Sequence, residues 1–401
     1  MAGTVHRSAR VARRPGAHPH PLARLLLAAV VLTLIAGIAG GLLRAGVVVP
    51  GIGTPAWVGP AATWHGALMV GGFLGTMIGI ERAVALKHPL AWSAPAVSAS
   101  AALALVLGAR QLGASLLVAA STAFVCANVV LVRRQPANHT TLLLVAASAW
   151  LAGNAMALAG VAGAAVVACW FTFLLLTVAA ERLEMTRLMR RRPAAQPLLA
   201  GVVLALLGGA GASAVAPSAG GVAFGVALVL LAAWLLVFDI ARRTAGVHGL
   251  PRYMALCLLG GYLWLAAGGV AWAATSVGIP VRDAALHAIG LGFIGSMVLG
   301  HAPVILPAVA RVKLAFGRMF YVPLAALHLS LVARLGPGLL DPRWRWGGAL
   351  ANVLALLLFA VIVLAAARAW HVRERIARER GDAPAASFTT PEQMASEPGL
   401  R

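Results

Sequence analysis

Two histidines, His65 and His287, each lie a few residues inside a long apolar stretch of the sequence. An imidazole in hydrocarbon costs free energy unless a partner engages its ring nitrogens. If both stretches are helices that cross a membrane in the same direction, the two imidazoles lie at nearly the same depth. A haem iron held between the helices would engage both side chains. The alternative is that each histidine only bonds a nearby carbonyl group or the outer membrane interface.

Other charged or imidazole side chains near these stretches extend the candidate site. Arg282 lies about one helical turn before His287 and could pair with a haem propionate, or it could be an ordinary interfacial arginine. His301 follows His287 by fourteen residues, which is about 21 Å along a helix, so it cannot share the same iron. A second metal centre of His301 with His328 stays open, although their expected depths differ and Pro303 is expected to disturb the local helix.

The composition indicates the class of protein that carries these residues. Hydrophobic residues make up 61% of the 401 residues, charged residues make up only 11%, and the mean hydropathy is +0.90. These values are typical of a polytopic membrane protein. The net charge of +21 would fit a nucleic-acid partner, but the basic residues flank the apolar stretches and follow a membrane topology instead. We expect no nucleic-acid partner.

Twelve apolar stretches have about the 17 to 25 residues needed to cross a bilayer core. We therefore predict an all-α integral membrane protein. The predicted spans are residues 24–43, 61–81, 91–109, 113–132, 140–159, 161–181, 196–216, 220–240, 253–275, 284–306, 319–335 and 347–368.

The basic residues predict which side of the membrane holds the chain ends. An even number of spans places both termini on one side, and this side would hold 26 of the 32 basic residues. Positive charge favours the cytoplasmic side, so both termini are predicted to be cytoplasmic. The inner set includes Arg7, Arg10, Arg13, Arg14, Arg133, Arg134, Arg190 to Arg192, Arg242, Arg243, Arg311, Lys313 and Arg318. The outer set is Arg44, Arg110, Arg282, Arg334, Arg343 and Arg345.

The chain divides into two tails and one membrane domain. Residues 1–23 form a basic N-terminal tail, residues 24–370 form the twelve-helix domain, and residues 371–401 form a charged C-terminal tail that we expect to be disordered. The first apolar stretch lacks a convincing cleavage site and is interpreted as a retained span. Arginine outnumbers lysine 30 to 2, which suggests a GC-rich bacterial gene and a location in the plasma (inner) membrane.

An internal repeat relates the second, sixth and tenth spans. When these spans are aligned on Phe73, Phe173 and Phe293, the eighth residue after each phenylalanine is Glu81, Glu181 and His301 respectively. Four spans separate successive copies. This pattern predicts three pseudo-symmetric four-helix arcs whose equivalent helices face a central axis, although chance similarity among helices rich in Leu, Ala and Gly would also explain it.

The remaining polar and sulfur-containing residues have mainly structural interpretations. Glu81, Glu181, Glu184 and Asp239 lie at predicted cytoplasmic helix ends beside arginines, where ion pairing reduces the desolvation penalty. A proton or ion entrance is the alternative, but no chain of acidic groups continues through the mid-membrane. The three cysteines lie in apolar helices without CxxC spacing, so no disulfide or thiolate metal site is predicted.

The second span, Trp64-His65-Gly66-Ala67-Leu68-Met69, and the tenth, which runs from His287 through Phe293 to Gly300, resemble NnrS-type haem and copper membrane proteins. More distantly, they are similar to subunit I of haem-copper oxidases. The resemblance implies a twelve-helix bundle of three arcs with cytoplasmic termini. It also implies that His65 and His287 are the axial ligands of a low-spin haem near the outer face.

Departures from both families limit the chemistry that the resemblance implies. NnrS-type sequences carry a further histidine and a glutamate where this chain has Ala67 and Leu68. The oxidases draw copper ligands from histidines of the sixth and seventh helices, which here contain none. Copper is therefore possible but not supported by the ligand spacing, since Met69 or Met297 alone would hold at best Cu(I). Reduction of oxygen or nitric oxide at a binuclear centre is not expected.

Two functional hypotheses remain. The first is a haem b protein related to NnrS that acts in redox chemistry, electron transfer or nitrosative stress, with His65 and His287 as iron ligands and Arg282 beside a propionate. The second is a haem-free transporter or membrane assembly factor that uses the same bundle for another ligand. The bilayer is the one predicted partner; the sequence indicates neither an electron donor nor an oligomeric state.

Overall fold

The computed structural model of the chain describes residues 21–47, 54–161, 163–185 and 193–380, and every element in these ranges is a helix. The arginines at positions 7, 10, 13, 14 and 190–192, which are predicted to lie on the cytoplasmic side, fall outside the described residues. Within the described part, twelve helices are long and apolar enough to cross a membrane, as the sequence predicts. The chain is a multi-pass membrane protein.

The first six spans run from α1 to α8. Two of them are composite, because a π-helical segment lies inside the second and a 3-10 turn begins the third. They are α1 (Pro21–Arg44); α3 (His65–Ala67) with η1 (Leu68–Gly75) and α4 (Thr76–Leu86); η2 (Pro89–Trp92) with α5 (Ser93–Val106); α6 (Arg110–Arg134); α7 (Asn138–Leu158); and α8 (Ala164–Met185).

The last six spans run from α9 to α16, and the tenth again contains a π-helical segment. They are α9 (Ala195–Ala212); α10 (Pro217–Phe238); α12 (Leu250–Ser276); α13 (Arg282–His287) with η3 (Ala288–Gly295) and α14 (Ser296–Val309); η4 (Arg318–Phe320) with α15 (Tyr321–Leu335) and η5 (Pro337–Leu339); and α16 (Pro342–Glu379). The short helices α2 (Val58–Thr63) and α11 (Ala241–Thr244) lie in connections.

The predicted C-terminal boundary is wrong by about two helical turns. The sequence places the start of a disordered tail at residue 371, whereas α16 continues to Glu379. Ion pairs at i,i+4 spacing support this extension: Arg378 pairs with Glu374 at 2.8 Å and Arg375 with Glu379 at 3.7 Å. Charge density alone therefore did not indicate where the helix ends.

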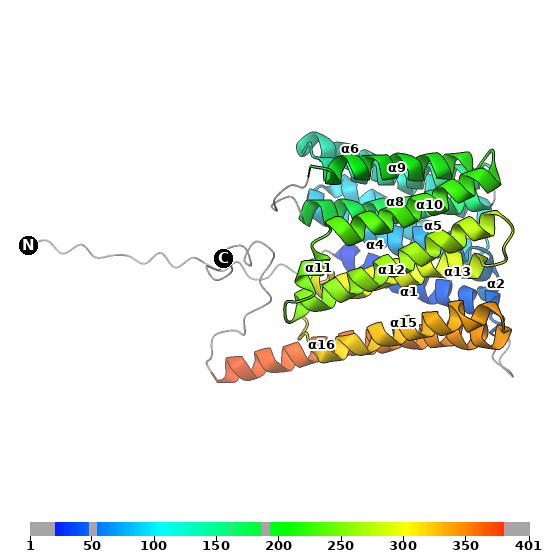
Figure 1. Cartoon of the computed structure of the whole chain (residues 1–401). Coiled ribbons are helices and arrows are strands. Elements are labelled where there is room, and N and C mark those ends of the chain that lie inside the picture. Colours follow the sequence, from blue (N-terminus) through cyan, green and yellow to red (C-terminus); the bar gives the residue numbers. More distant parts are fainter. Residues whose placement is uncertain (1–20, 48–53, 162, 186–192, 381–401) are drawn as a thin grey trace, which may run out of the picture.

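The spans are arranged as a ring in which sequence neighbours are also neighbours in space, and α1 contacts α16 to close it. Figure 1 shows the helices side by side, with their axes roughly aligned. The second, sixth and tenth spans also contact one another, through η1 with α8, η3 with α8, and α4 with α14. The sixth span is the most enclosed, with 83% of its most apolar window buried.

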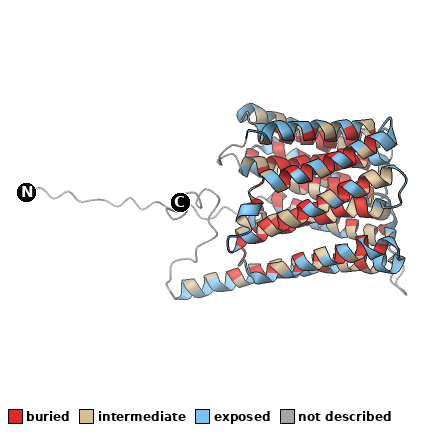
Figure 2. Cartoon of the chain, viewed as in Figure 1, coloured by how far each residue is buried: buried red, intermediate tan, exposed pale blue. Residues whose placement is uncertain are grey.

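The outer surface of the ring is apolar. Leu32, Leu263 and Leu329 are each more than 60% exposed although they lie in the middle of long helices. Figure 2 shows exposed residues along the outward faces of the helices and buried residues along the inward faces. Exposed leucines on every side suit a lipid environment rather than water.

Two π-helical segments occupy matching positions in the second and tenth spans. Each begins five residues before the aligned phenylalanine, Phe73 or Phe293, and ends two residues after it. Hydroxyl groups satisfy carbonyl groups within these wider turns: Ser98 of α5 donates to Gly71 at 2.8 Å, and Ser296 donates to Gly292 at 2.6 Å. π-helical segments are rare in proteins, and those that occur are often found at functional sites.

Close packing of α10 against α12 depends on two facing glycines. A Cβ at Gly225 would lie 2.6 Å from the carbonyl oxygen of Gly269, and a Cβ at Gly269 would lie 2.7 Å from that of Gly225. Small residues let membrane helices approach closely and gain van der Waals contact. Neither backbone can accept a methyl group without moving the helices apart.

We expect Gly225→Ala to destabilise the bundle by about 1 to 3 kcal/mol, the range for overpacking a close interface. Thermal unfolding of the purified protein in detergent measures this as a lower Tm. Gly208→Ala on α9 is the matched control, because a Cβ there meets no atom within 4 Å. Equal Tm values for the two variants would contradict the role given to the α10–α12 contact.

Candidate functional site

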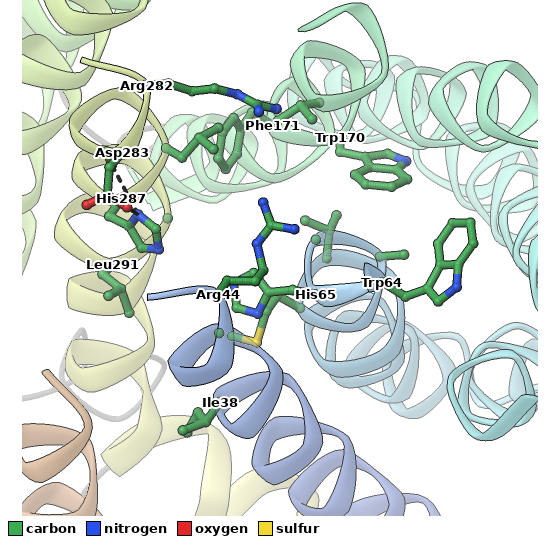
Figure 3. A pocket seen from close by; sticks show the side chains of 18 of the residues that line it. Ile38, Arg44, Trp64, His65, Trp170, Phe171, Arg282, Asp283, His287 and Leu291 are labelled. Atoms are coloured by element: carbon green, nitrogen blue, oxygen red, sulfur yellow. Dashed lines mark hydrogen bonds and ion pairs between the residues drawn. The ribbon is translucent and has the colours of Figure 1, made fainter. Parts of the chain in front are cut away.

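A cavity of about 680 Å³ lies at the end of the bundle where α1 ends and α13 begins. Residues from the first, second, fourth, fifth, sixth, tenth, eleventh and twelfth spans line it. His65 and His287 both belong to this lining, and Figure 3 shows them with the side chains around the same space. The structure therefore brings the two predicted histidines to one cavity.

His65 is fixed by helix α1. Its Nδ1 lies 2.8 Å from the main-chain oxygen of Gly37. A carbonyl oxygen only accepts hydrogen bonds, so Nδ1 carries the proton and donates. The ring also lies against Gly41, where a Cβ would come within 2.8 Å of Cε1. The glycine makes room for the ring, and the neutral tautomer keeps a free lone pair on Nε2.

His287 is oriented by an acidic residue one turn earlier on α13. Its Nδ1 lies 2.9 Å from Oδ1 of Asp283 and 3.0 Å from the Asp283 main-chain oxygen. Arg334 of α15 holds the same carboxylate with two bonds, from Nε to Oδ2 at 3.0 Å and from Nη2 to Oδ1 at 2.8 Å. The paired carboxylate accepts the Nδ1 proton, so Nε2 of His287 again keeps its lone pair.

The guanidinium of Arg334 also touches the ring of His287. Its Nη2 is 3.2 Å from Nδ1 and 3.1 Å from Nε2. A nitrogen at nearly equal distances from both ring nitrogens cannot lie on the lone-pair axis of Nε2, which points away from Nδ1. The guanidinium therefore packs against the imidazole and contacts both ring nitrogens, so a metal bound at Nε2 would replace the contact with Arg334.

These contacts give both histidines one feature of metal-ligating imidazoles, a ring nitrogen that donates to a fixed acceptor. Among the described residues, no group of three or more His, Cys, Asp or Glu side chains is placed to hold a metal ion. A haem requires only axial ligands from the protein, because the macrocycle supplies the other four. The pair of imidazoles fits that requirement.

Arginines give the cavity a strong positive charge. The lining contains Arg44, Arg110, Arg282, Arg334 and Arg345, and its only acidic residue is Asp283. Arg282 and Arg345 form no ion pair with another described residue, whereas Arg334 is paired with Asp283. Uncompensated guanidinium groups in a cavity favour an anionic ligand. Arg282, predicted beside a haem propionate, does line the cavity.

Aromatic and apolar side chains form the walls between the charged mouth and the interior. Trp64, Trp170 and Phe171 line the cavity (Figure 3). Trp170 is fixed by a hydrogen bond from Nε1 to Asn154 at 2.9 Å. Gly66 leaves space beside Trp170, because a Cβ there would contact the indole at 3.4 Å. Flat, rigid walls of this kind suit a planar ligand.

His301 and His328, which the sequence left open as a second centre, have different partners. Nδ1 of His301 bonds the main-chain oxygen of Met297 at 2.8 Å, and its Nε2 lies 3.4 Å from Arg182. His328 accepts a hydrogen bond from Nε1 of Trp264 at 2.8 Å. Neither histidine lines the cavity. The structure places each within its own local contacts.

The acidic residues at the other end of the bundle have polar partners, and Glu81 and Glu181 form the predicted ion pairs with an arginine. Arg82 lies 3.2 Å from Glu81 and 3.4 Å from Glu181, which joins the second and sixth spans. Glu184 lies 3.9 Å from His139 of the fifth span. Asp239 accepts a hydrogen bond from the hydroxyl of Tyr262. Pairing thus joins helix ends that the sequence separates widely.

The sequence reasoning missed the residues that orient the two histidines. Asp283 precedes His287 by four residues, so both lie on one helix face, and this spacing could have identified the pair. Arg334 was assigned only to the outer boundary. Five of the six arginines predicted for the outer side line the cavity, so their concentration was the available signal. The carbonyl of Gly37 left no signal in the sequence.

A protein-family model matches residues 23–368, and the family is described as a domain of unknown function, DUF8744. The comparison with curated proteins and with solved structures gave no match.

We expect Arg334→Gln to lower the stability by about 2 kcal/mol, less than the full loss for a buried pair because Asp283 is 29% exposed. Thermal unfolding measures the loss, and Arg343→Gln, an exposed arginine outside the cavity lining, is the control. The double variant Asp283→Asn/Arg334→Gln should lose less than the sum of the single losses. Strictly additive losses would show that the two side chains are not coupled.

Proposed function

The chain belongs to the DUF8744 family, a domain of unknown function by its description, and from its site we propose that it is a haem-binding integral membrane protein. In this proposal His65 and His287 are the two axial ligands of a haem b, and Arg282 pairs with an anionic edge of the macrocycle. The function that follows is redox chemistry, electron transfer or a response to nitrosative stress. The proposal includes no oxidase-type copper site.

One observation carries the proposal: two histidines from distant spans line a single cavity, and each has its Nδ1 held by an acceptor. Holding Nδ1 fixes the ring orientation and the tautomer, and it strengthens Nε2 as a ligand. Two such imidazoles would hold the haem iron between the second and tenth spans. A haem held in this way would supply one-electron chemistry, and two ligands from the protein would favour electron transfer over binding of a gas.

The other residues of the cavity have roles that suit the same ligand. Trp170 and Phe171 would pack against an apolar ring and exclude water from it. Arg282 and Arg345 would hold carboxylate groups at the mouth, where the charge remains partly hydrated. Asp283 and Arg334 would hold the ring of His287 in a fixed orientation.

We also propose that the bundle has the three pseudo-symmetric arcs of the haem-copper oxidase subunit I-like fold, with a relation to NnrS-type proteins. Two observations support this. The second, sixth and tenth spans contact one another at the centre, and the π-helical segments of the second and tenth coincide when Phe73 is aligned with Phe293. The continuous α-helix of the sixth span is the less similar member.

A haem-free transporter or membrane assembly factor is the second candidate function. The observation that favours it is the positive charge of the cavity, since Arg282 and Arg345 would bind an anionic solute equally well. The same haem experiment separates the two candidates.

We predict that the detergent-purified protein, expressed with ample haem supply, holds about one haem per chain and shows a sharp reduced α-band of a low-spin haem. His65→Gly and His287→Gly should each abolish this band, because each removes one axial ligand. Imidazole added to either variant should restore it by entering the vacated space. Visible spectra, a haem extraction assay and metal analysis on one sample measure these results.

His328→Gly is the matched control, because it removes a helix-embedded imidazole that does not line the cavity. It should leave the spectrum unchanged. A colourless wild-type protein, or a band that survives both cavity variants, would exclude the haem proposal. Stabilisation by an added anionic solute would then support the transporter candidate.

We further propose that the protein lies in a bacterial inner membrane with both termini in the cytoplasm. Alkaline phosphatase, which is active only outside the cytoplasm, should therefore be inactive when fused after Glu379 and active when fused in the loop after Gly278. A fluorescent reporter that folds only in the cytoplasm should show the reverse. Activity of the phosphatase at the C-terminus would overturn the topology.

A further inference from the structure

Helices α1 and α16 both line the cavity, but they are tied to different parts of the bundle. α16 contributes Arg345, Ala349, Asn352, Val353 and Leu356, which lie on one helix face from the mouth inward. α1 contributes Ile38, Gly41, Leu42 and Arg44, and Ala45 follows its C-terminal end. The cavity therefore extends to the line where the first and last spans meet.

Polar contacts hold each of these helices to other partners. α1 is joined to the second span through Gly37 and His65, and to the connecting helix α2 through Arg44, which donates to the main-chain oxygen of Ala62 at 3.3 Å. α16 is joined to α15, since Asn352 donates to Ser330 at 2.7 Å and accepts from Arg334 at 3.4 Å. In the described part of the chain, no hydrogen bond or ion pair links α1 to α16.

The apolar packing is divided in the same way. The buried residues of α1, Leu26 and Val30, belong to a cluster with the second span and the end of α14. The buried residues of α16, including Ala355 and Ile362, belong to a separate cluster with α12 and α15. Figure 1 shows α15 and α16 together along one edge of the bundle. The α1–α16 seam therefore has no apolar core of its own.

The side chains at this seam are apolar and only half-buried. Ile38 and Leu42 on α1, and Val353 and Leu356 on α16, all line the cavity and yet keep part of their surface exposed. Because these residues line the cavity, their exposed surface includes the part that faces the cavity. Entry through the mouth would bring an apolar body past the guanidinium groups of Arg282 and Arg345.

We infer that the α1–α16 seam is a lateral entrance through which a membrane-dissolved, flat, dianionic amphiphile passes from the outer leaflet into the cavity. The apolar body of this ligand moves between Leu42 and Val353, while its anionic groups stay at membrane-surface depth and meet Arg345 and Arg282. This inference rests on the proposed function and names haem as the ligand that loads by this route. Among the described residues, separation of α1 from α16 breaks no polar contact. Separation of α15 from α16 would break the hydrogen bonds of Asn352 with Ser330 and Arg334.

The first experiment tests whether the seam is open to lipid, without any haem. Leu42→Cys and Val353→Cys are made separately in a Cys126→Ala background, because Cys126 is exposed and the other two native cysteines are buried. In lipid nanodiscs, a lipid-soluble bulky thiol reagent should label both positions much faster than a charged, water-soluble reagent. Faster labelling by the water-soluble reagent would show that both residues face an aqueous cavity, and the lateral entrance would be excluded.

The second experiment measures the rate at which the apo-protein in nanodiscs takes up haem supplied in lipid. Modification of Val353→Cys or Leu42→Cys before loading should slow uptake by about tenfold or more, and reduction of the mixed disulfide should restore it. Leu357→Cys, which is 55% exposed on the same helix but outside the cavity lining, is the control and should not slow uptake. Restoration by reduction shows that the modified protein remained folded.

The outcomes separate this inference from the proposed function. If the unmodified protein takes up no haem, the haem proposal fails, and lateral haem loading fails with it. If the unmodified protein takes up haem and modification at the seam leaves the rate unchanged, the haem proposal stands and the lateral entrance is excluded. If modification at the seam blocks uptake only when haem is supplied from water, and not when haem is supplied in lipid, the lateral route is likewise excluded.

Discussion

A polar group inside an apolar bundle must find a partner within the protein, and this constraint shapes the whole cavity. His65 and His287 each satisfy one ring nitrogen with a nearby acceptor, but the acceptors differ. One is a main-chain carbonyl of a neighbouring helix, and the other is a carboxylate on the same helix that needs an arginine of its own. Nε2 of His65 forms no hydrogen bond with another described residue, whereas Nε2 of His287 contacts Nη2 of Arg334 at 3.1 Å. Two imidazoles of fixed orientation follow from the way their Nδ1 atoms are satisfied.

The helices that carry these histidines are also the ones whose backbone departs from α-helical geometry. The short α-helix that carries each histidine is followed directly by a glycine-rich π-helical segment, η1 or η3. In these segments the helix is wider and its carbonyl groups are less regularly paired. Hydroxyls of Ser98 and Ser296 compensate by donating to carbonyls there. The sixth span contacts both of these segments. The wider turns therefore help to set the distance between the sixth span and its two neighbours at the centre of the ring.

The number of spans and the pair of histidines could be predicted from the sequence because both depend on strong local signals. A span needs only enough consecutive apolar residues, and an imidazole among them stands out. The partners could not be predicted equally well. Asp283 was within reach, since it lies one turn from His287, but the carbonyl of Gly37 and the guanidinium of Arg334 come from helices whose positions depend on tertiary packing. The end of α16 was misplaced for a related reason: paired charges at i,i+4 spacing extend a helix that composition alone describes as a tail.

Five of the six arginines that the predicted topology places on the outer side line the cavity. The positive-inside bias predicts few arginines on that side, and the ones assigned to it cluster at one place instead of spreading over the loops. Five guanidinium groups around one carboxylate repel one another, so their concentration lowers the stability of the empty site. An anionic ligand would relieve that repulsion, and its binding energy would include the energy so released. The same charges resist entry of an apolar body from water, which leaves the weakly joined α1–α16 seam as the route with the smaller barrier.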